Sequence, residues 1–191
     1  MKYVAIDVET TGLDSEKNQV LQVGAVIEDT NNKLAFKDIP KFNYLVKHDS
    51  YYFSNEYPLV LNSWIFKEFL NHKTEFEITY AENITMLLAN WIKDNLPESF
   101  DLISEKVVIV IAGKNPSFDK KFIESLPHFH DYISIHHRFM DPTTLFTDFK
   151  EDILPPSLSD CKERANFKSA VVTHDALDDA WDIVELLRTK Y

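Results

Sequence analysis

Two acidic residues near the start of the chain, Asp7 and Glu9, stand at the end of a short apolar segment. Residues 3–8 are apolar and β-branched, which predicts a strand, and side chains two apart on a strand share one face. The apolar residues Val4, Ile6 and Val8 would then point into the core from the opposite face. Two carboxylates this close repel each other unless a cation lies between them, and Mg²⁺ prefers oxygen ligands. The pair is therefore a candidate metal site, although two solvated charges at a strand end would give the same pattern.

A third acidic residue, Asp119, follows the apolar run 107–112 and lies inside a helix that Pro116 opens. Ligands of α/β sheets gather at the carboxyl ends of strands, so Asp119 is a second candidate ligand. An acid in the first turn of a helix also complements the helix dipole, and the position alone does not separate the two interpretations.

The last predicted helix, 175–188, carries a fourth candidate. At about 100° per residue, Asp179 borders the apolar face of this helix, whereas Asp178 lies roughly opposite it. A carboxylate beside a buried face needs a partner or a metal ion, so Asp179 is the candidate ligand and Asp178 should be solvated. His174 falls just before the helix, either as a surface histidine or as a base that belongs to a site.

The elements that must position these residues follow from hydrophobic periodicity. Strands at 3–8, 19–28 and 42–47, joined by short turns, predict an antiparallel meander. The rest of the chain predicts helices at 59–70 and 81–96, a central strand buried on both faces at 107–112, a helix from 116, a short strand at 138–141, and helices at 142–149, 158–167 and 175–188. This order predicts an α/β fold with a mixed β-sheet flanked by helices.

The bulk properties favour one soluble, intracellular domain. A length of 191 residues predicts a single domain, 1–191, with a helical and aromatic-rich middle segment at about 48–100. Cys161 is the only cysteine, which excludes an internal disulfide and favours a reducing compartment. The first apolar stretch is too short for a signal peptide, and no apolar run approaches the roughly 20 residues that span a bilayer. We therefore expect a cytoplasmic protein without a membrane partner.

The net charge of −11 bears on the kind of partner. A protein that binds long duplex DNA usually has a basic face. This chain has no obvious run of basic residues. Any contact with nucleic acid is therefore expected to be short and local, with help from bound cations.

Together, three segments resemble the motifs of the DEDDh 3′→5′ exonuclease family. They are Asp7-Val8-Glu9-Thr10-Thr11-Gly12-Leu13, Asn115-Pro116-Ser117-Phe118-Asp119 and His174-Asp175-Ala176-Leu177-Asp178-Asp179-Ala180. They occur in the family's order and cover essentially the whole chain. Members include the epsilon proofreading subunit, oligoribonuclease and ribonuclease T, and their fold is ribonuclease-H-like.

The resemblance implies a role for each matching residue. Asp7, Glu9, Asp119 and Asp179 would hold two ions, Mg²⁺ or Mn²⁺, and His174 would be the general base. The implied partner is the 3′ end of a single-stranded nucleic acid, shortened with release of nucleoside 5′-monophosphates; a homodimer or a polymerase partner is also compatible. The implied substrate-binding residues are Thr10, Thr11, Gly12, Leu13, Asn115 and Phe118.

Several readings remain open from the sequence. The same fold could serve as an inactive interaction module or as a ribonuclease-H-like endonuclease, and the sequence does not separate DNA from RNA. Lys114, Lys120 and Lys121 could meet phosphates or simply be solvated. The aromatics of Tyr51–Tyr57 could stack on bases or pack over the sheet. Asp141, in a segment that loosely resembles oligoribonuclease, could support the site.

Overall fold

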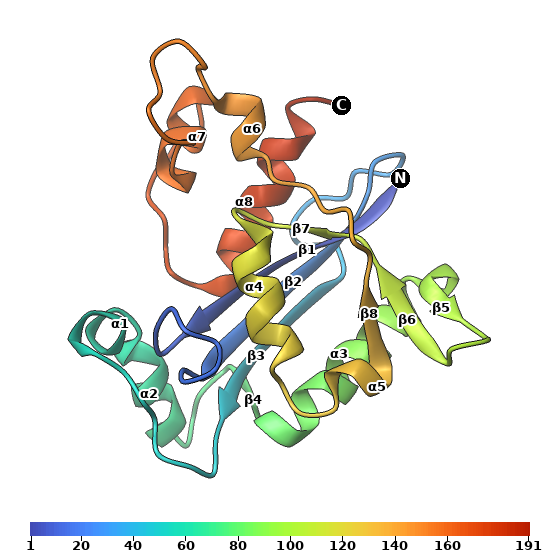
Figure 1. Cartoon of the computed structure of the whole chain (residues 1–191), viewed down its shortest axis with the longest axis vertical. Coiled ribbons are helices and arrows are strands. Elements are labelled where there is room, and N and C mark those ends of the chain that lie inside the picture. The colour runs from blue at the N-terminus through green and yellow to red at the C-terminus, as the bar shows by residue number, and fades with distance from the viewer.

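The computed structural model describes residues 1–191 and shows a mixed sheet with helices on both faces (Figure 1). The main sheet has five strands in the order β4-β3-β2-β1-β7, and a smaller sheet has the order β5-β6-β8. The strands are β1 Lys2–Thr10, β2 Val20–Asp29, β3 Lys41–Lys47, β4 Glu77–Tyr80, β5 Phe100–Asp101, β6 Lys106–Ile109, β7 Ile111–Ala112 and β8 Ile133–Ile135. The helices are α1 Glu56–Leu61, α2 Ser63–Leu70, α3 Ala81–Asn95, α4 Pro116–Glu124, α5 Phe129–Tyr132, α6 Thr143–Phe146, α7 Leu158–Arg164 and α8 Ala176–Arg188, with a 3₁₀ turn at Pro97–Ser99.

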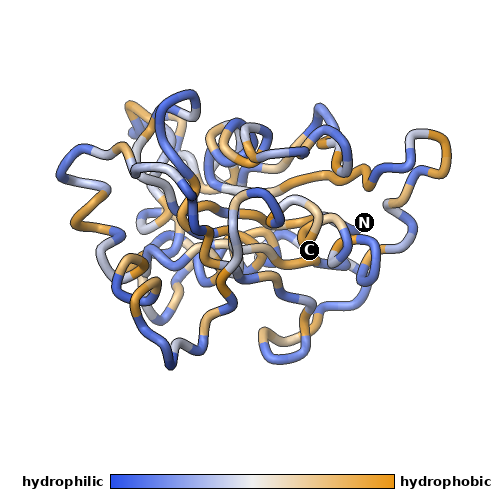
Figure 2. Tube along the Cα trace, turned by 90° about the horizontal axis from the view of Figure 1, so that it is seen from below, coloured by the Kyte–Doolittle hydropathy of each residue, from blue (hydrophilic) through white to orange (hydrophobic).

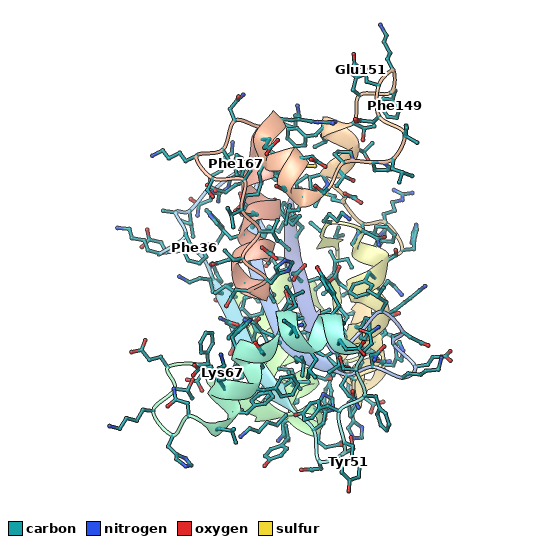
Figure 3. The ribbon with its side chains drawn as sticks, turned by 90° about the vertical axis from the view of Figure 1, so that its left-hand side faces the viewer. Phe36, Tyr51, Lys67, Phe149, Glu151 and Phe167 are labelled. Atoms are coloured by element: carbon teal, nitrogen blue, oxygen red, sulfur yellow. The ribbon has the colours of Figure 1, made fainter.

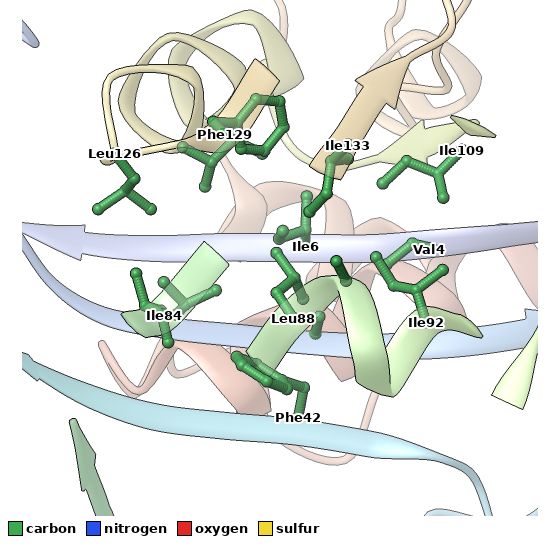
Figure 4. Close-up of a cluster of buried hydrophobic side chains, with 14 of the residues drawn as sticks. Val4, Ile6, Phe42, Ile84, Leu88, Ile92, Ile109, Leu126, Phe129 and Ile133 are labelled. Carbon is green, nitrogen blue, oxygen red and sulfur yellow. The ribbon is translucent and has the colours of Figure 1, made fainter. Parts of the chain in front are cut away.

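Strands β1, β2 and β3 form the predicted antiparallel meander. Alternate side chains of β1 enter two different cores. Val4, Ile6 and Val8 face α3, α4 and α5, whereas Tyr3 and Ala5 face α8. Figure 4 shows Val4 and Ile6 packed among Ile84, Leu88 and Ile92 of α3. In the tube of Figure 2 the central strands are largely apolar, whereas many of the outer segments are polar.

The second face of the sheet is shared by two helices. α8 packs on the β1–β2 half, and Ile65 of α2 packs on Leu21 and Leu45. A buried ion pair holds the far end of α8: Arg188 donates to both oxygens of the Glu28 carboxylate, at 2.8 and 2.6 Å. Two-point pairing of this kind fixes geometry as well as distance, so α8 has a set register on β2.

The run 107–112 differs from the prediction of one central strand buried on both faces. It splits into β6, which pairs with β8 of the small sheet, and β7, which pairs with β1 over Val4 and Ala5 alone. Val108 is exposed, so β6 is not buried on both faces. The prediction was wrong here because an apolar run does not reveal that its two halves pair with different neighbours.

Other boundaries also differ. The predicted strand 138–141 is reduced to a single bridge between Met140 and Ala112. The predicted helix 59–70 breaks at Asn62 into α1 and α2. The polar strand β4 was not predicted. No helix of the chain is long and apolar enough to cross a membrane.

Candidate active site

Asp7 and Glu9 lie on the α8 side of β1, as the alternation of the strand predicts. Across the β1–β2 ladder, Asp7 stands opposite Gly24 and Glu9 opposite Gln22. Glu9 is only 7% exposed. Both carboxylates therefore project into the region where α8 begins.

Asp119 reaches the same strand from its edge. Because β7 pairs with β1 only as far as Ala5, the later part of β1 keeps a free edge on this side. The first turn of α4 fills it: Asp119 is 2% exposed, and its Oδ1 accepts a hydrogen bond of 3.2 Å from the backbone N–H of Val8. This hydrogen bond holds Asp119 at Val8, the residue between Asp7 and Glu9 in β1.

The N-terminus of α8 approaches β2 unusually closely. A Cβ atom at Gly24 would lie 2.2 Å from the backbone carbon of Ala176, so only glycine allows this contact. Gln22, fully buried in β2, accepts a hydrogen bond of 3.0 Å from the backbone N–H of Ala176. Asp175 caps the helix by accepting from the N–H groups of Leu177 and Asp178. These contacts fix the start of α8 against the acidic end of β1.

The start of α8 brings His174 and Asp179 to the site. Asp179 is 5% exposed and Asp178 is exposed, so the assignment of faces from helical periodicity is confirmed. His174 adopts a left-handed backbone conformation, φ 54°, which is uncommon for a residue with a side chain. Its Nδ1 lies 4.0 Å from Oε1 of Glu9, and ligand atoms of Glu9, His174 and Asp179 all lie within 4.8 Å of one another.

Burial controls the acidity of the four carboxyl groups. It raises the pKa of Glu9 to about 7, that of Asp119 to about 7 and that of Asp179 to about 6. The pKa of Asp7 is raised well above its usual range, first by burial and then by the charges of its acidic neighbours. A hydrogen bond from Asn62 partly opposes the shift of the pKa of Glu9.

None of the four carboxylates forms an ion pair with a lysine or arginine. Buried acids without a cationic partner favour their neutral form, and a divalent cation reverses that preference by supplying the missing charge. An all-carboxylate donor set with one imidazole fits a hard cation such as Mg²⁺ or Mn²⁺.

A cavity of about 500 Å³ opens beside Glu9. Five of the six predicted substrate-binding residues line it: Thr10, Thr11, Gly12, Leu13 and Phe118. Leu13 is 85% exposed, whereas the hydroxyl groups of both threonines are engaged within the loop, in bonds to Gly12 O and Gln19 Oε1. The backbone and the apolar side chains of this loop therefore form the surface that faces the cavity.

Asn115 lies outside this cavity. It is exposed at the start of α4, its backbone N–H donates to Asp141 at 3.0 Å, and its side chain accepts from Ser117. Asp141 also accepts from the N–H and hydroxyl of Thr143, so it ties the start of α4 to α6. The geometry gives both residues a structural position; the contact of Asn115 with substrate stays a prediction.

The aromatic residues of the segment Tyr51–Tyr57 differ in position: some are available for stacking on a base, and others pack against the protein. Tyr57 lines the cavity and is exposed, as Leu13 is. Tyr52 packs edge-on against Phe66 of α2. Tyr51 points outward from the lower end of the molecule (Figure 3). Among the lysines, Lys120 pairs with Glu124 at 2.5 Å, and Lys114 and Lys121 are exposed.

Sequence reasoning missed three residues of this region: Asn62, Gln22 and Thr173. Asn62 donates to Thr10 O from the α1–α2 junction, and Thr173 Oγ1 lies 3.4 Å from Asp179 Oδ1. Each acts through a contact distant in sequence or in an irregular segment. Only Gln22 had a detectable sequence signal, because it is a polar residue within a mostly apolar predicted strand.

The chain was compared with known proteins. The family model RNase_T, which describes an exonuclease, matches residues 4–187. No curated protein matched the chain in sequence.

Several solved nucleases share the fold at low identity. The nuclease domain of 3′hExo, a DEDDh family member bound to rAMP, has 15% identity and a TM-score of 0.69 over 98% of this chain and 90% of its own. Cell-death related nuclease 4 has 14% identity and a TM-score of 0.63, over 98% and 62% of the two chains. E. coli Exonuclease I in complex with a dT13 oligonucleotide has 13% identity and a TM-score of 0.64, over 98% and 40%. The chain thus spans most of the first of these proteins and under two thirds of the other two.

Proposed function

Since the chain belongs to the RNase_T family of exonucleases, we propose that it is a metal-dependent 3′→5′ exonuclease acting on single-stranded nucleic-acid ends. Family membership and the shared fold also confirm the predicted resemblance to the DEDDh exonucleases and the ribonuclease-H-like architecture. The observation that carries the proposal is the cluster of Glu9, His174 and Asp179, with the buried acids Asp7 and Asp119 near it, beside a cavity of about 500 Å³.

Asp7, Glu9, Asp119 and Asp179 would hold two divalent cations, Mg²⁺ or Mn²⁺. When bound, such ions supply positive charge that polarises a phosphodiester and favours ionisation of the attacking water. Burial of Asp119 and Asp179 keeps these carboxylates fixed, so they need little rearrangement to act as ligands.

His174 is proposed as the general base. The imidazole ring is the side chain that most often takes a proton from water in catalysis. Its neighbour Glu9, 4.0 Å away, stabilises the imidazolium that forms. Attack on the terminal phosphodiester then releases a nucleoside 5′-monophosphate.

The cavity beside Glu9 would receive the terminal nucleotide. Leu13, Tyr57 and Phe118 offer apolar surface for a base from different segments of the chain. The related structures were determined with rAMP and with a dT13 oligonucleotide, which agrees with a site for nucleotides at a single-stranded end. We further propose that residues 1–191 act as one exonuclease domain.

A 5′-labelled single-stranded oligonucleotide tests this function. With Mg²⁺ or Mn²⁺ the protein should produce a ladder that shortens from the 3′ end, and a chelator or Asp7→Ala should abolish it. Asp94→Ala, on the exposed surface of α3, is the matched control and should leave the ladder unchanged. An intact oligonucleotide that still binds would favour an inactive interaction module, and cleavage of a circular substrate would reveal an endonuclease.

A further inference from the structure

The segment between α7 and α8, residues 165–175, carries His174 to the site. In Figure 1 it runs from α7 to the beginning of α8. Every residue from 163 to 175 is exposed or only partly buried, so apolar packing does little to hold this segment. Between residues 168 and 174 its backbone makes no hydrogen bond to another backbone group. The place of His174 is therefore set by contacts with side chains.

Two side chains of α7 contact the middle of the segment. Ser159 Oγ donates to the carbonyl oxygen of Ala170 at 2.9 Å. Lys162 Nζ donates to the carbonyl oxygen of Val171 at 2.7 Å. His174 follows three residues later with φ 54°, a conformation that persists in a residue with a side chain only where the surroundings hold it. The contacts from α7 are the nearest hydrogen bonds from another element to the backbone before His174.

Lys162 is the only buried lysine of the chain, with 5% of its surface exposed. Its ammonium group also forms an ion pair with the carboxylate of Asp182, in the second turn of α8. Asp182 lies three residues after Asp179, and residues at this spacing are neighbours on a helix surface. One ammonium group therefore connects α7, the segment that precedes His174 and the helix that carries Asp179.

A simple packing contact between α7 and α8 would not need a lysine. Removing two charges from water costs about as much as their attraction returns, and apolar side chains of similar size serve stability as well or better. An ammonium group differs from an apolar group because it has three donors and can bind two acceptors at once. The specific contribution of Lys162 is thus to fix the carbonyl of Val171 relative to α8.

We propose that Lys162 is a positioning residue for His174. Its hydrogen bond to Val171 and its ion pair with Asp182 hold the segment so that the imidazole lies beside Glu9. The inference rests on the proposed function and adds the contact that sets the place of its base. Without Lys162 the imidazole spends less time in position, whereas the carboxylates on β1, α4 and α8 keep their places.

The first test is the kinetics of Lys162→Met on a single-stranded oligonucleotide. Displacement of the base should lower kcat about tenfold, with KM close to that of the wild type. Lys67→Met is the matched control, because Lys67 is exposed on α2 and makes no ion pair or side-chain hydrogen bond (Figure 3). A variant with unchanged kcat, or with a change confined to KM, would overturn the inference.

A second variant separates positioning from stability. Lys162→Met leaves Asp182 without its partner and should lower Tm. The double variant Lys162→Met/Asp182→Leu replaces the ion pair with apolar side chains and should recover most of that loss. Its kcat should nevertheless stay about tenfold low, because the hydrogen bond to Val171 is still missing. If kcat returned to the wild-type value together with Tm, Lys162 would be merely structural and the inference would be wrong.

A double-mutant cycle with His174→Ala identifies the residue through which Lys162 acts. In the His174→Ala protein, the change at Lys162 should lower kcat no further, because a positioning residue has no effect once the base is absent. The cycle uses whichever of the two Lys162 variants folds. Independent losses that multiply would show that Lys162 acts on another part of the site, which contradicts the proposal.

Trypsin cleavage after Lys168 measures the segment without turnover, since Lys168 is exposed within it. Loss of one charged hydrogen bond should make this cleavage about tenfold faster in the double variant than in the wild type. Equal cleavage would show that Lys162 does not hold the segment. A wild type that shortens no oligonucleotide would refute the proposed function instead, and the trypsin result would still decide whether Lys162 fixes the segment.

Discussion

Replacing Asp119 with asparagine should make the metal-free protein more stable at about pH 8, even though the residue belongs to the proposed metal site. Its carboxyl is 2% exposed, and burial raises its pKa from 3.8 to about 7. Because each pKa unit is worth about 1.4 kcal/mol, ionisation of Asp119 costs the folded state as much as about 4 kcal/mol. Asparagine retains the oxygen that accepts from Val8 and carries no charge.

The sign of the pH dependence follows from the raised pKa. Between about pH 4 and pH 7 the folded state binds more protons than the unfolded state, so the stability of the metal-free wild type falls as pH rises through this window. At about pH 5 the folded carboxyl is still protonated but the unfolded one is already ionised, so Asp119→Asn should lead the wild type by less than half of its margin at about pH 8. At about pH 8 the variant should lead by about 2 kcal/mol, because neighbouring carboxyls share protons and relieve part of the cost. For a chain of this length that is roughly 4–8 °C in Tm.

Thermal unfolding in a chelator at both pH values measures this difference, with exposed Asp94→Asn as the control. Adding Mg²⁺ should raise the Tm of the wild type more than that of Asp119→Asn, because cations that bind only the folded state stabilise it. A metal-free Asp119→Asn protein no more stable than the wild type at about pH 8 would refute the claim that an uncompensated charge is buried here.

Three further outcomes are expected. Asp179→Ala should abolish cleavage, whereas Asp178→Ala should retain it within about twofold, since only the first side chain is buried in the site; a cleavage assay on both variants would expose a reversed assignment. His174→Ala should lower kcat by about 100-fold or more with little change in oligonucleotide affinity, and a loss confined to affinity would count against the base role. Gly24→Ala should cost about 1–3 kcal/mol in urea unfolding and most of the activity, because its Cβ would meet the backbone of Ala176; wild-type stability would show that α8 can shift without consequence.

The sequence predicted those parts of the fold in which local pattern and tertiary environment agree. Short apolar segments joined by turns predicted the meander, and the helical spacing of the last helix separated Asp179 from Asp178. The ordered acidic motifs gave the family. Each of these signals comes from residues close together in the chain. The spacing of apolar residues there matches the period of the helix or strand that they form.

What escaped prediction depends on distant partners. The split of 107–112 between two sheets is set by which strands pair with each half, and nothing in the six residues records it. Asn62 was read as part of a continuous helix, because its contact with Thr10 spans the meander. Gln22 holds the start of α8 through a hydrogen bond from Ala176. Because the two residues are distant in sequence, this contact could not be predicted from the chain alone.

The order of the site residues along the chain has a consequence for synthesis. Asp7 and Glu9 leave the ribosome early, whereas His174 and Asp179 emerge only after the whole sheet has been translated. A nascent chain therefore carries the start of the acidic cluster without its completing members. The cluster is therefore completed only when α8, the last element of the chain, has packed onto β1 and β2.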